Sequence, residues 1–222
     1  AGSDKPALRK VVNEVREDDH SWWIGMGDYG EFIQRKDKRW QARALERKYR
    51  QGSIDNICQE QIDCINVELY PIADKCLGIL DGNHELKIFE EYGHSITYEM
   101  WKCFNDIKAG ELPKGQPKDA VLNPDTYKNP KVRRLYDAAV IRITFTHKTK
   151  GRYDWQKSFD IYATHSNIAG SRPGSKVNRI EGILKDWPTV DAVLTAHGHA
   201  MPVVPYTAQG FNRYGKLVDF KK

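Results

Sequence analysis

Long apolar runs are absent from this chain of 222 residues. A helix that crosses a membrane needs about 20 consecutive apolar residues, and no segment approaches that length, so we expect no membrane partner. The first twenty residues also contain no continuous apolar stretch of the kind that a secretory signal requires. Hydrophobic residues still make up 40% of the chain, which is enough to bury the core of a single domain over residues 1–222.

Cysteine is scarce, and none of the four cysteines forms a Cys-x-x-Cys pair. A domain of this size does not need disulfide bonds to stabilise its core, so we expect reduced thiols and a cytoplasmic protein. Structural zinc sites commonly use cysteine ligands, so the sequence also disfavours a purely structural zinc site. The four residues are Cys58, Cys64, Cys76 and Cys103.

Basic residues outnumber acidic residues by 35 to 30, which gives a formal net charge of +5 and a pI near 8.9. Such a surface favours polyanionic partners without requiring them. Many of the basic residues fall in one stretch, namely Arg35, Lys36, Lys38, Arg39, Arg43, Arg47, Lys48 and Arg50. This stretch is either a solvated helix face or a surface that binds DNA or RNA. We expect the aromatic residues between Phe89 and Phe104 to pack in the core rather than to stack on bases.

Apolar residues recur with helical periodicity in several stretches, and shorter apolar runs between them predict strands. We expect helices at 5–17, about 38–50, 54–69, from 86 to about 108 and 176–185, and strands at 22–25, 76–80, 140–145, 159–163, 192–194, 203–206 and 217–220. Four prolines between residues 113 and 130 predict an irregular insertion at about 109–138. The alternation of strands and helices predicts a layered α/β domain with a mixed sheet, or with two sheets packed together.

Polar residues with metal-binding side chains follow four of the apolar runs. Loops at the carboxyl ends of neighbouring strands meet at one edge of an α/β sheet, so we expect these side chains to gather there. They offer carboxylate, carboxamide and imidazole groups, which suit divalent metals of borderline hardness. The sequence therefore predicts a metal site near Asp28, Asn83, His84, His165, His197 and His199.

This set of side chains suits a site with two divalent cations. Two cations about 3.5–4 Å apart can activate water and neutralise a phosphoryl group. Asp28 is the natural bridge between them because its carboxylate carries two anionic oxygens. Asn83 would present its side-chain oxygen to one ion, with His165 and one of the paired histidines beside it. The ligand types are compatible with manganese, iron, zinc and magnesium, of which we expect manganese.

His84 lies directly after Asn83 and would project toward a substrate rather than toward a metal. An imidazole in that place can donate a proton to a leaving alkoxide or stabilise charge on phosphoryl oxygens, so we assign His84 as catalytic. Glu85 either orients His84 or favours the N-terminus of the following helix. Arg172 lies in a loop after His165, and it either binds the phosphate of the substrate or simply belongs to a turn.

Together these blocks resemble the successive motifs of the calcineurin-like metallophosphoesterases, over roughly residues 22–202. The blocks are Gly27-Asp28, Gly82-Asn83-His84-Glu85, His165 and His197-Gly198-His199. The resemblance implies a layered fold in which mixed β-sheets pack face to face and are flanked by helices. It also implies that Asn83, His165 and His197 join Asp28 around one ion. His199 would join Asp28 around the other ion.

The family opens with an Asp-x-His motif on a first strand, which would precede the helix at 5–17. We therefore expect the domain to be N-terminally incomplete in this chain. The residues Asp18, Asp19 and His20 have the same pattern but follow that helix, and we interpret them as a solvated helix end.

The leading hypothesis for function is a two-metal phosphoester hydrolase in which metal-bound hydroxide attacks phosphorus in line. Within this class the basic stretch favours a phosphodiesterase or nuclease. One alternative is a phosphomonoesterase that acts on nucleotides or phosphoproteins. Another is a scaffold that keeps the fold without turnover, since the opening motif is absent from this chain.

Overall fold

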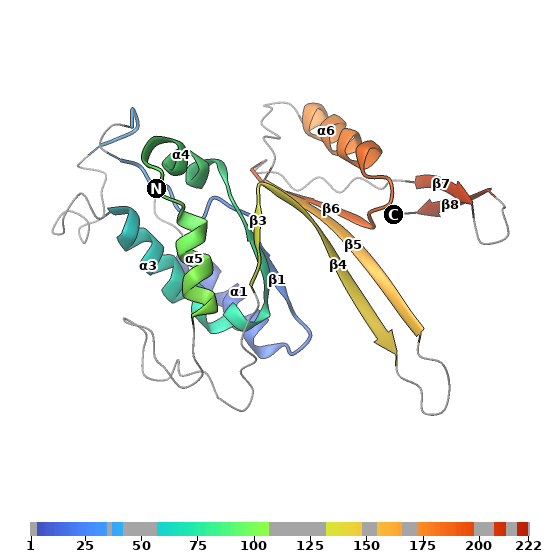
Figure 1. Cartoon of the computed structure of the whole chain (residues 1–222), viewed down its shortest axis with the longest axis horizontal. Helices are drawn as coiled ribbons and strands as arrows, with labels where there is room; N and C mark the ends of the chain where they lie inside the picture. Colours follow the sequence, from blue (N-terminus) through green and yellow to red (C-terminus); the bar gives the residue numbers. More distant parts are fainter. Residues whose placement is uncertain are drawn as a thin grey trace. The chain divides into compact units, whose positions relative to one another are not determined.

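The computed structural model describes residues 4–34, 37–41, 57–106, 132–147, 155–165, 173–197, 207–211 and 217–221. Its contacts divide the chain into two compact units, Ala1–Tyr136 and Asp137–Lys222, each built from both helices and strands (Figure 1). The protein is therefore of mixed α/β class, as the sequence predicts. A single domain over residues 1–222 stays a prediction.

The first unit is built around a small parallel sheet. Its strands are β1 (Trp23–Gly25), β2 (Cys76–Leu80) and β3 (Arg134–Tyr136), in the order β1-β2-β3. Both pairings are parallel, so all three carboxyl ends lie at one edge of the sheet. The central strand β2 is almost entirely buried, which explains its continuous apolar sequence.

Strand β3 corrects part of the sequence prediction, because it lies within the range expected to be an irregular insertion. Its three residues, Arg-Leu-Tyr, carry no alternating pattern of their own. The strand forms because its backbone pairs with β2, where Ile79 lies beside Arg134 and Leu80 beside Tyr136. The earlier part of the insertion, 107–131, lies outside the described residues.

Helices of the first unit pack on this sheet and on one another. Helix α1 (Lys5–Glu17) has the predicted bounds, and the Asp4 side chain caps it by accepting the Ala7 N–H at 3.1 Å. Helix α3 (Ile57–Leu69) follows, and the short 3-10 helix η3 (Tyr70–Lys75) leads from it into β2. Arg9 of α1 makes two hydrogen bonds of 2.7 Å with Glu68 of α3, which ties the two helices together.

The helical stretch expected from residue 86 to about 108 is two helices, α4 (Asn83–Tyr92) and α5 (Ile96–Asn105). Gly93 separates them, because it adopts a left-handed conformation with φ of 68° and ends α4. The Ser95 side chain then caps α5 by accepting the Tyr98 N–H. Glycine is a common residue just after a helix, and serine is a common N-cap. Gly93 and Ser95 could therefore have predicted the break between the two helices.

The prediction that the aromatic residues between Phe89 and Phe104 pack in the core is correct for some of them and wrong for others. Phe104 is fully buried and packs edge-on against Trp23. Phe89, Tyr92 and Tyr98 are 54%, 47% and 42% exposed, so these three rings lie largely at the surface. The core itself consists of Phe32, Ile62, Tyr70, Ala73, Cys76, Ile79, Ile88, Ile96, Met100, Phe104 and Val132.

Cys76 lies in this core, and its chemistry follows from its burial. The side chain is 4% exposed, and burial raises its pKa to about 12. Because the thiolate is the reactive form, we expect N-ethylmaleimide at pH 8 to leave Cys76 unmodified in the folded protein. Peptide mass spectrometry should find it labelled only after unfolding in guanidinium. Labelling of folded Cys76 as fast as the half-buried Cys64 would contradict this prediction.

The basic stretch is described only at Asp37–Gln41, which form a turn and not the start of the helix expected at about 38–50. The Asp37 carboxylate accepts the backbone N–H of Arg39 and its guanidinium, and it also binds Lys87 of α4 at 2.8 Å. These bonds lower the pKa of Asp37. They also stabilise the turn in place of a first helical turn. Residues 42–50 lie outside the described part of the chain.

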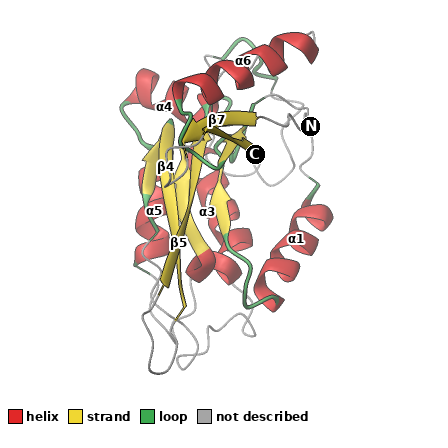
Figure 2. Ribbon diagram, turned by 90° about the vertical axis from the view of Figure 1, so that its right-hand side faces the viewer, coloured by secondary structure: helices red, strands yellow, loops and turns green. Residues whose placement is uncertain are grey.

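The second unit contains a mixed sheet, as the antiparallel signals predicted. Strands β4 (Ala138–His147) and β5 (Trp155–Thr164) pair antiparallel as a long ribbon (Figure 2). Strand β6 (Ala192–Thr195) pairs parallel with β5 (Figure 1). Helix α6 (Pro173–Asp186) connects β5 to β6 along the chain and contacts β6. This β5-α6-β6 motif places the carboxyl ends of β5 and β6 side by side.

A separate two-stranded antiparallel sheet follows in the second unit. It consists of β7 (Thr207–Phe211) and β8 (Leu217–Lys221). The second of the predicted closing strands therefore forms, while the first, at 203–206, lies outside the described residues. No described helix is both long and apolar enough to cross a membrane.

Candidate metal centre

Asp28 follows β1 on a tight left-handed turn. Gly27 has φ of 84° and Asp28 has φ of 55°. Aspartate adopts such a conformation more readily than most residues other than glycine, so the turn suits the sequence. It places the half-buried carboxylate just beyond the carboxyl end of β1, as the sequence predicts.

Glu85 holds this turn in place from the first turn of α4. Glu85 is 1% exposed, and its carboxylate accepts three backbone N–H groups, from Asp28, Tyr29 and Gly82, each at 2.8 Å. Burial raises the pKa of Glu85, and the three donors oppose that effect. Glu85 therefore acts from the first turn of the helix, one of the two roles that the sequence left open, and its bonds go to the backbone of the Asp28 turn and of Gly82. A glutamate three residues after a glycine N-cap is a capping-box spacing, and this spacing could have revealed it.

Gly82 allows α4 to approach Asp28 closely. A Cβ atom at this position would lie 2.2 Å from the Asp28 backbone N and 2.4 Å from its Oδ1. It would also lie 2.6 Å from Glu85 Oε2. Any other residue would therefore push Asp28 and α4 apart.

His84 contacts the same turn through both its backbone and its ring. Its N–H donates to Asp28 Oδ1 at 3.2 Å, so the carboxylate lies at the N-terminus of α4, where the helix dipole favours negative charge. The ring Nδ1 lies 2.9 Å from the Gly30 carbonyl oxygen. A carbonyl can only accept, so Nδ1 carries a proton, and Nε2 is the ring atom that can exchange a proton with a substrate.

Asn83 is the first residue of α4 and is exposed. It lies between Gly82 and His84, and both of these neighbours closely approach Asp28. The first unit therefore brings Asp28, Asn83 and His84 to one edge of its sheet.

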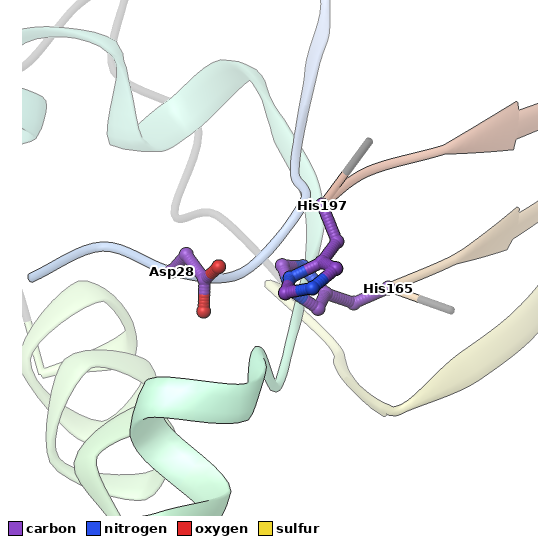
Figure 3. A group of neighbouring side chains, drawn as sticks. All are labelled: Asp28, His165 and His197. Carbon is purple, nitrogen blue, oxygen red and sulfur yellow. The ribbon is translucent and has the colours of Figure 1, made fainter. Parts of the chain in front are cut away.

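His165 and His197 come together in the second unit. They follow β5 and β6, whose last residues Thr164 and Thr195 lie side by side in register. The two rings meet edge to face with their centroids 5.5 Å apart, and one nitrogen of each ring lies within 4.8 Å of the other (Figure 3). Both side chains are half-buried.

The backbone fixes these two histidines. The His165 N–H donates to the Asp137 carbonyl, and the Ala196 N–H donates to the Thr164 carbonyl, both at 3.1 Å. His197 has φ of 71°, a left-handed conformation that is uncommon for a residue other than glycine. Strain of this kind is most common at functional sites, and here it turns the His197 ring toward His165.

Two predicted site residues, His199 and Arg172, lie outside the described residues. The meeting of Asp28 and Asn83 from one unit with His165 and His197 from the other stays a prediction. Asp18, Asp19 and His20 lie at the exposed C-terminal end of α1, where Asp18 accepts the His20 N–H. This agrees with their interpretation as a solvated helix end.

The carboxylate of the first unit and the two imidazoles of the second are each a type of ligand that suits a divalent cation. Neutral imidazole nitrogens and a carboxylate are typical ligands of manganese, iron and zinc. The chain matches no family model, no curated protein and no solved structure.

Proposed function

We propose that this protein is a metal-dependent phosphoester hydrolase with a dinuclear site, and that it acts on phosphodiesters, including DNA or RNA. The observation that carries the proposal is the pair of imidazoles, His165 and His197, held nitrogen to nitrogen within 4.8 Å by the ends of two parallel strands. Two histidines in this arrangement are suited to share one cation. The motifs in the sequence supply the rest of the ligand set, with Asp28 as the bridge.

The connectivity of the chain supports the meeting of the two halves of the ligand set. Strand β3 ends at Tyr136, whose carbonyl accepts the Asp81 N–H at 2.6 Å, one residue beyond β2. The next residue is Asp137, whose carbonyl accepts the His165 N–H. The consecutive residues Tyr136 and Asp137 thus accept hydrogen bonds from Asp81, just before Asn83, and from His165. We propose that the complete fold is the layered one of the calcineurin-like metallophosphoesterases.

The chain's own residues have distinct roles in this proposal. Asp28 would bridge the two cations, and Asn83, His165, His197 and His199 would complete their shells. Divalent cations in such a site lower the pKa of bound water and offset the charge on phosphoryl oxygens. His84, which is oriented by Gly30 through Nδ1, would hold a proton at Nε2 for the leaving alkoxide.

Metal content and hydrolysis test the proposal together. We expect the intact protein, loaded with manganese, to hold two ions per chain by elemental analysis and to hydrolyse a bis-aryl phosphate. Replacing His197 with alanine should remove at least one ion and most of the turnover. The matched control is His147→Ala, which removes an exposed imidazole of the same unit. An intact protein that binds no metal and hydrolyses no phosphoester would overturn the proposal.

The choice of a diester substrate has its own test. We expect faster hydrolysis of the bis-aryl phosphate and of single-stranded DNA than of a mono-aryl phosphate. Activity confined to the monoester would remove the diesterase assignment, although the metal site would still stand. Comparing single-stranded with double-stranded DNA under the same conditions would then show which form of the polymer reaches the site.

A further inference from the structure

Four side chains of the first unit stack into a continuous series, which we call the aromatic ladder: Trp101, Tyr98, Arg134 and Tyr136. The Trp101 and Tyr98 rings of α5 stack with their centroids 5.6 Å apart. The Arg134 guanidinium of β3 follows, with its Cζ atom 5.5 Å from the Tyr98 ring centroid and 5.0 Å from that of Tyr136. The ladder joins α5 to β3, which contact each other in the fold (Figure 1).

This arrangement costs the fold stability at two of its members. Arg134 donates through Nη2 to Ser95 Oγ at 3.1 Å, but its buried Nε has no hydrogen-bond partner among the residues that the structure describes. Tyr136 adopts a left-handed backbone with φ of 54°. A buried donor without a partner and a strained tyrosine are both unfavourable. Their occurrence in one cluster points to a use other than stability.

The outer end of the ladder is open to solvent. Tyr136 is 61% exposed and Tyr98 is 42% exposed. Exposed aromatic rings next to an arginine are what proteins use to stack the bases of single strands, because every base has a π-face and the cation attracts the nearby phosphates. The net charge of +5 favours the same kind of ligand.

The ladder lies at the edge of the sheet that carries Asp28 and Asn83. Tyr136 is the last residue of β3, and its carbonyl accepts the N–H of Asp81, two residues before Asn83. The ends of β1, β2 and β3 share one edge because the sheet is parallel. A base stacked on Tyr136 would therefore place its own backbone close to this edge.

We propose that the aromatic ladder binds the unstacked bases of single-stranded nucleic acid, with Tyr136 as the outermost stacking ring. Double-stranded DNA keeps its bases stacked inside the helix and cannot use such a surface. Binding of the single strand to the ladder does not require metal ions. Only the further statement, that the bound strand is the substrate for hydrolysis, rests on the proposed function.

The test measures the binding of a short fluorescein-labelled oligothymidylate by anisotropy, with EDTA present so that no hydrolysis occurs. The variant is Tyr136→Asn, because asparagine tolerates the left-handed backbone and removes the ring. We expect its Kd to rise about 5- to 150-fold, as for the loss of one stacked base. Tyr136→Phe keeps the ring and should bind within about twofold of the wild type. Tyr92→Ala, which removes an exposed ring outside the ladder, should bind like the wild type.

The salt dependence of binding and a second variant without a ladder ring distinguish the loss of stacking from other effects. The salt dependence of binding should have the same slope in the wild type and in Tyr136→Asn, because a stacking ring neutralises no phosphate. If Tyr136→Asn does not fold by circular dichroism, Tyr98→Leu removes the neighbouring ring at a helical position and should also weaken binding. Equal affinity of ring-deleted and wild-type proteins, or no binding by the wild type, would overturn the ladder proposal. Hydrolysis of the bis-aryl phosphate would still report separately on the metal site.

Discussion

Replacing Glu85 with glutamine is expected to destabilise the protein by about 3 kcal/mol. The buried carboxylate accepts three backbone N–H groups, and a glutamine offers one oxygen and one NH₂ group in their place. At least one N–H would then face another donor. A buried donor without an acceptor costs about 1–3 kcal/mol, and bonds to a charged acceptor are worth more than neutral ones.

Urea unfolding followed by circular dichroism measures this loss of stability. Glu90→Gln is the matched control, because Glu90 lies on the same helix and is exposed, so its replacement should change stability by no more than about 0.5 kcal/mol. The Asp28 turn should also loosen, and we expect manganese affinity to fall about 10- to 100-fold, as when an outer support of a metal ligand is removed. A Glu85→Gln protein as stable as the control would show that the three bonds contribute little.

If the protein hydrolyses phosphodiesters as we propose, replacing His84 with alanine is expected to lower turnover about 10²- to 10⁴-fold, which is the usual contribution of a general acid. The ring is oriented by the Gly30 carbonyl through Nδ1, so Nε2 is the atom available for proton transfer. The bond between Asp28 Oδ1 and residue 84 comes from the backbone N–H, and alanine keeps it. Metal content should therefore remain at the wild-type value.

Single-turnover kinetics on the intact, manganese-loaded protein, together with elemental analysis, separate these two effects. His20→Ala is the control, because His20 is exposed at the end of α1, and we expect it to leave both metal content and turnover unchanged. A His84→Ala protein that turns over at the wild-type rate would refute the catalytic role. Loss of metal in the same variant would instead make His84 part of the metal shell.

The sequence located the elements whose signals are local. The periodicity of α1 gave its bounds without error, and the continuous apolar run of β2 identified a buried strand. The polar residues after β1, β2, β5 and β6 were expected at strand ends, and the described ones lie there. These predictions held because capping, helical periodicity and strand burial act over a few neighbouring residues.

Other features of the fold depend on contacts between distant segments, and no local sequence pattern predicts them. The three residues of β3 form a strand only because β2 lies beside them, and the pattern of Arg-Leu-Tyr alone favours no structure. The exposure of Phe89 and Tyr98 depends on which faces of α4 and α5 other segments cover. The aromatic ladder joins α5 to β3, residues far apart in the chain.

Local sequence patterns are sufficient to place the candidate site residues at the ends of strands. These residues are Asp28, Asn83, His84, His165 and His197. How these side chains are held depends on contacts between segments that are distant in the chain. Glu85 reaches across to the Asp28 turn, and the β5–β6 register sets the two imidazoles against each other. The physical reason is that a hydrogen bond or a ring contact between distant segments depends on packing that neither segment encodes alone.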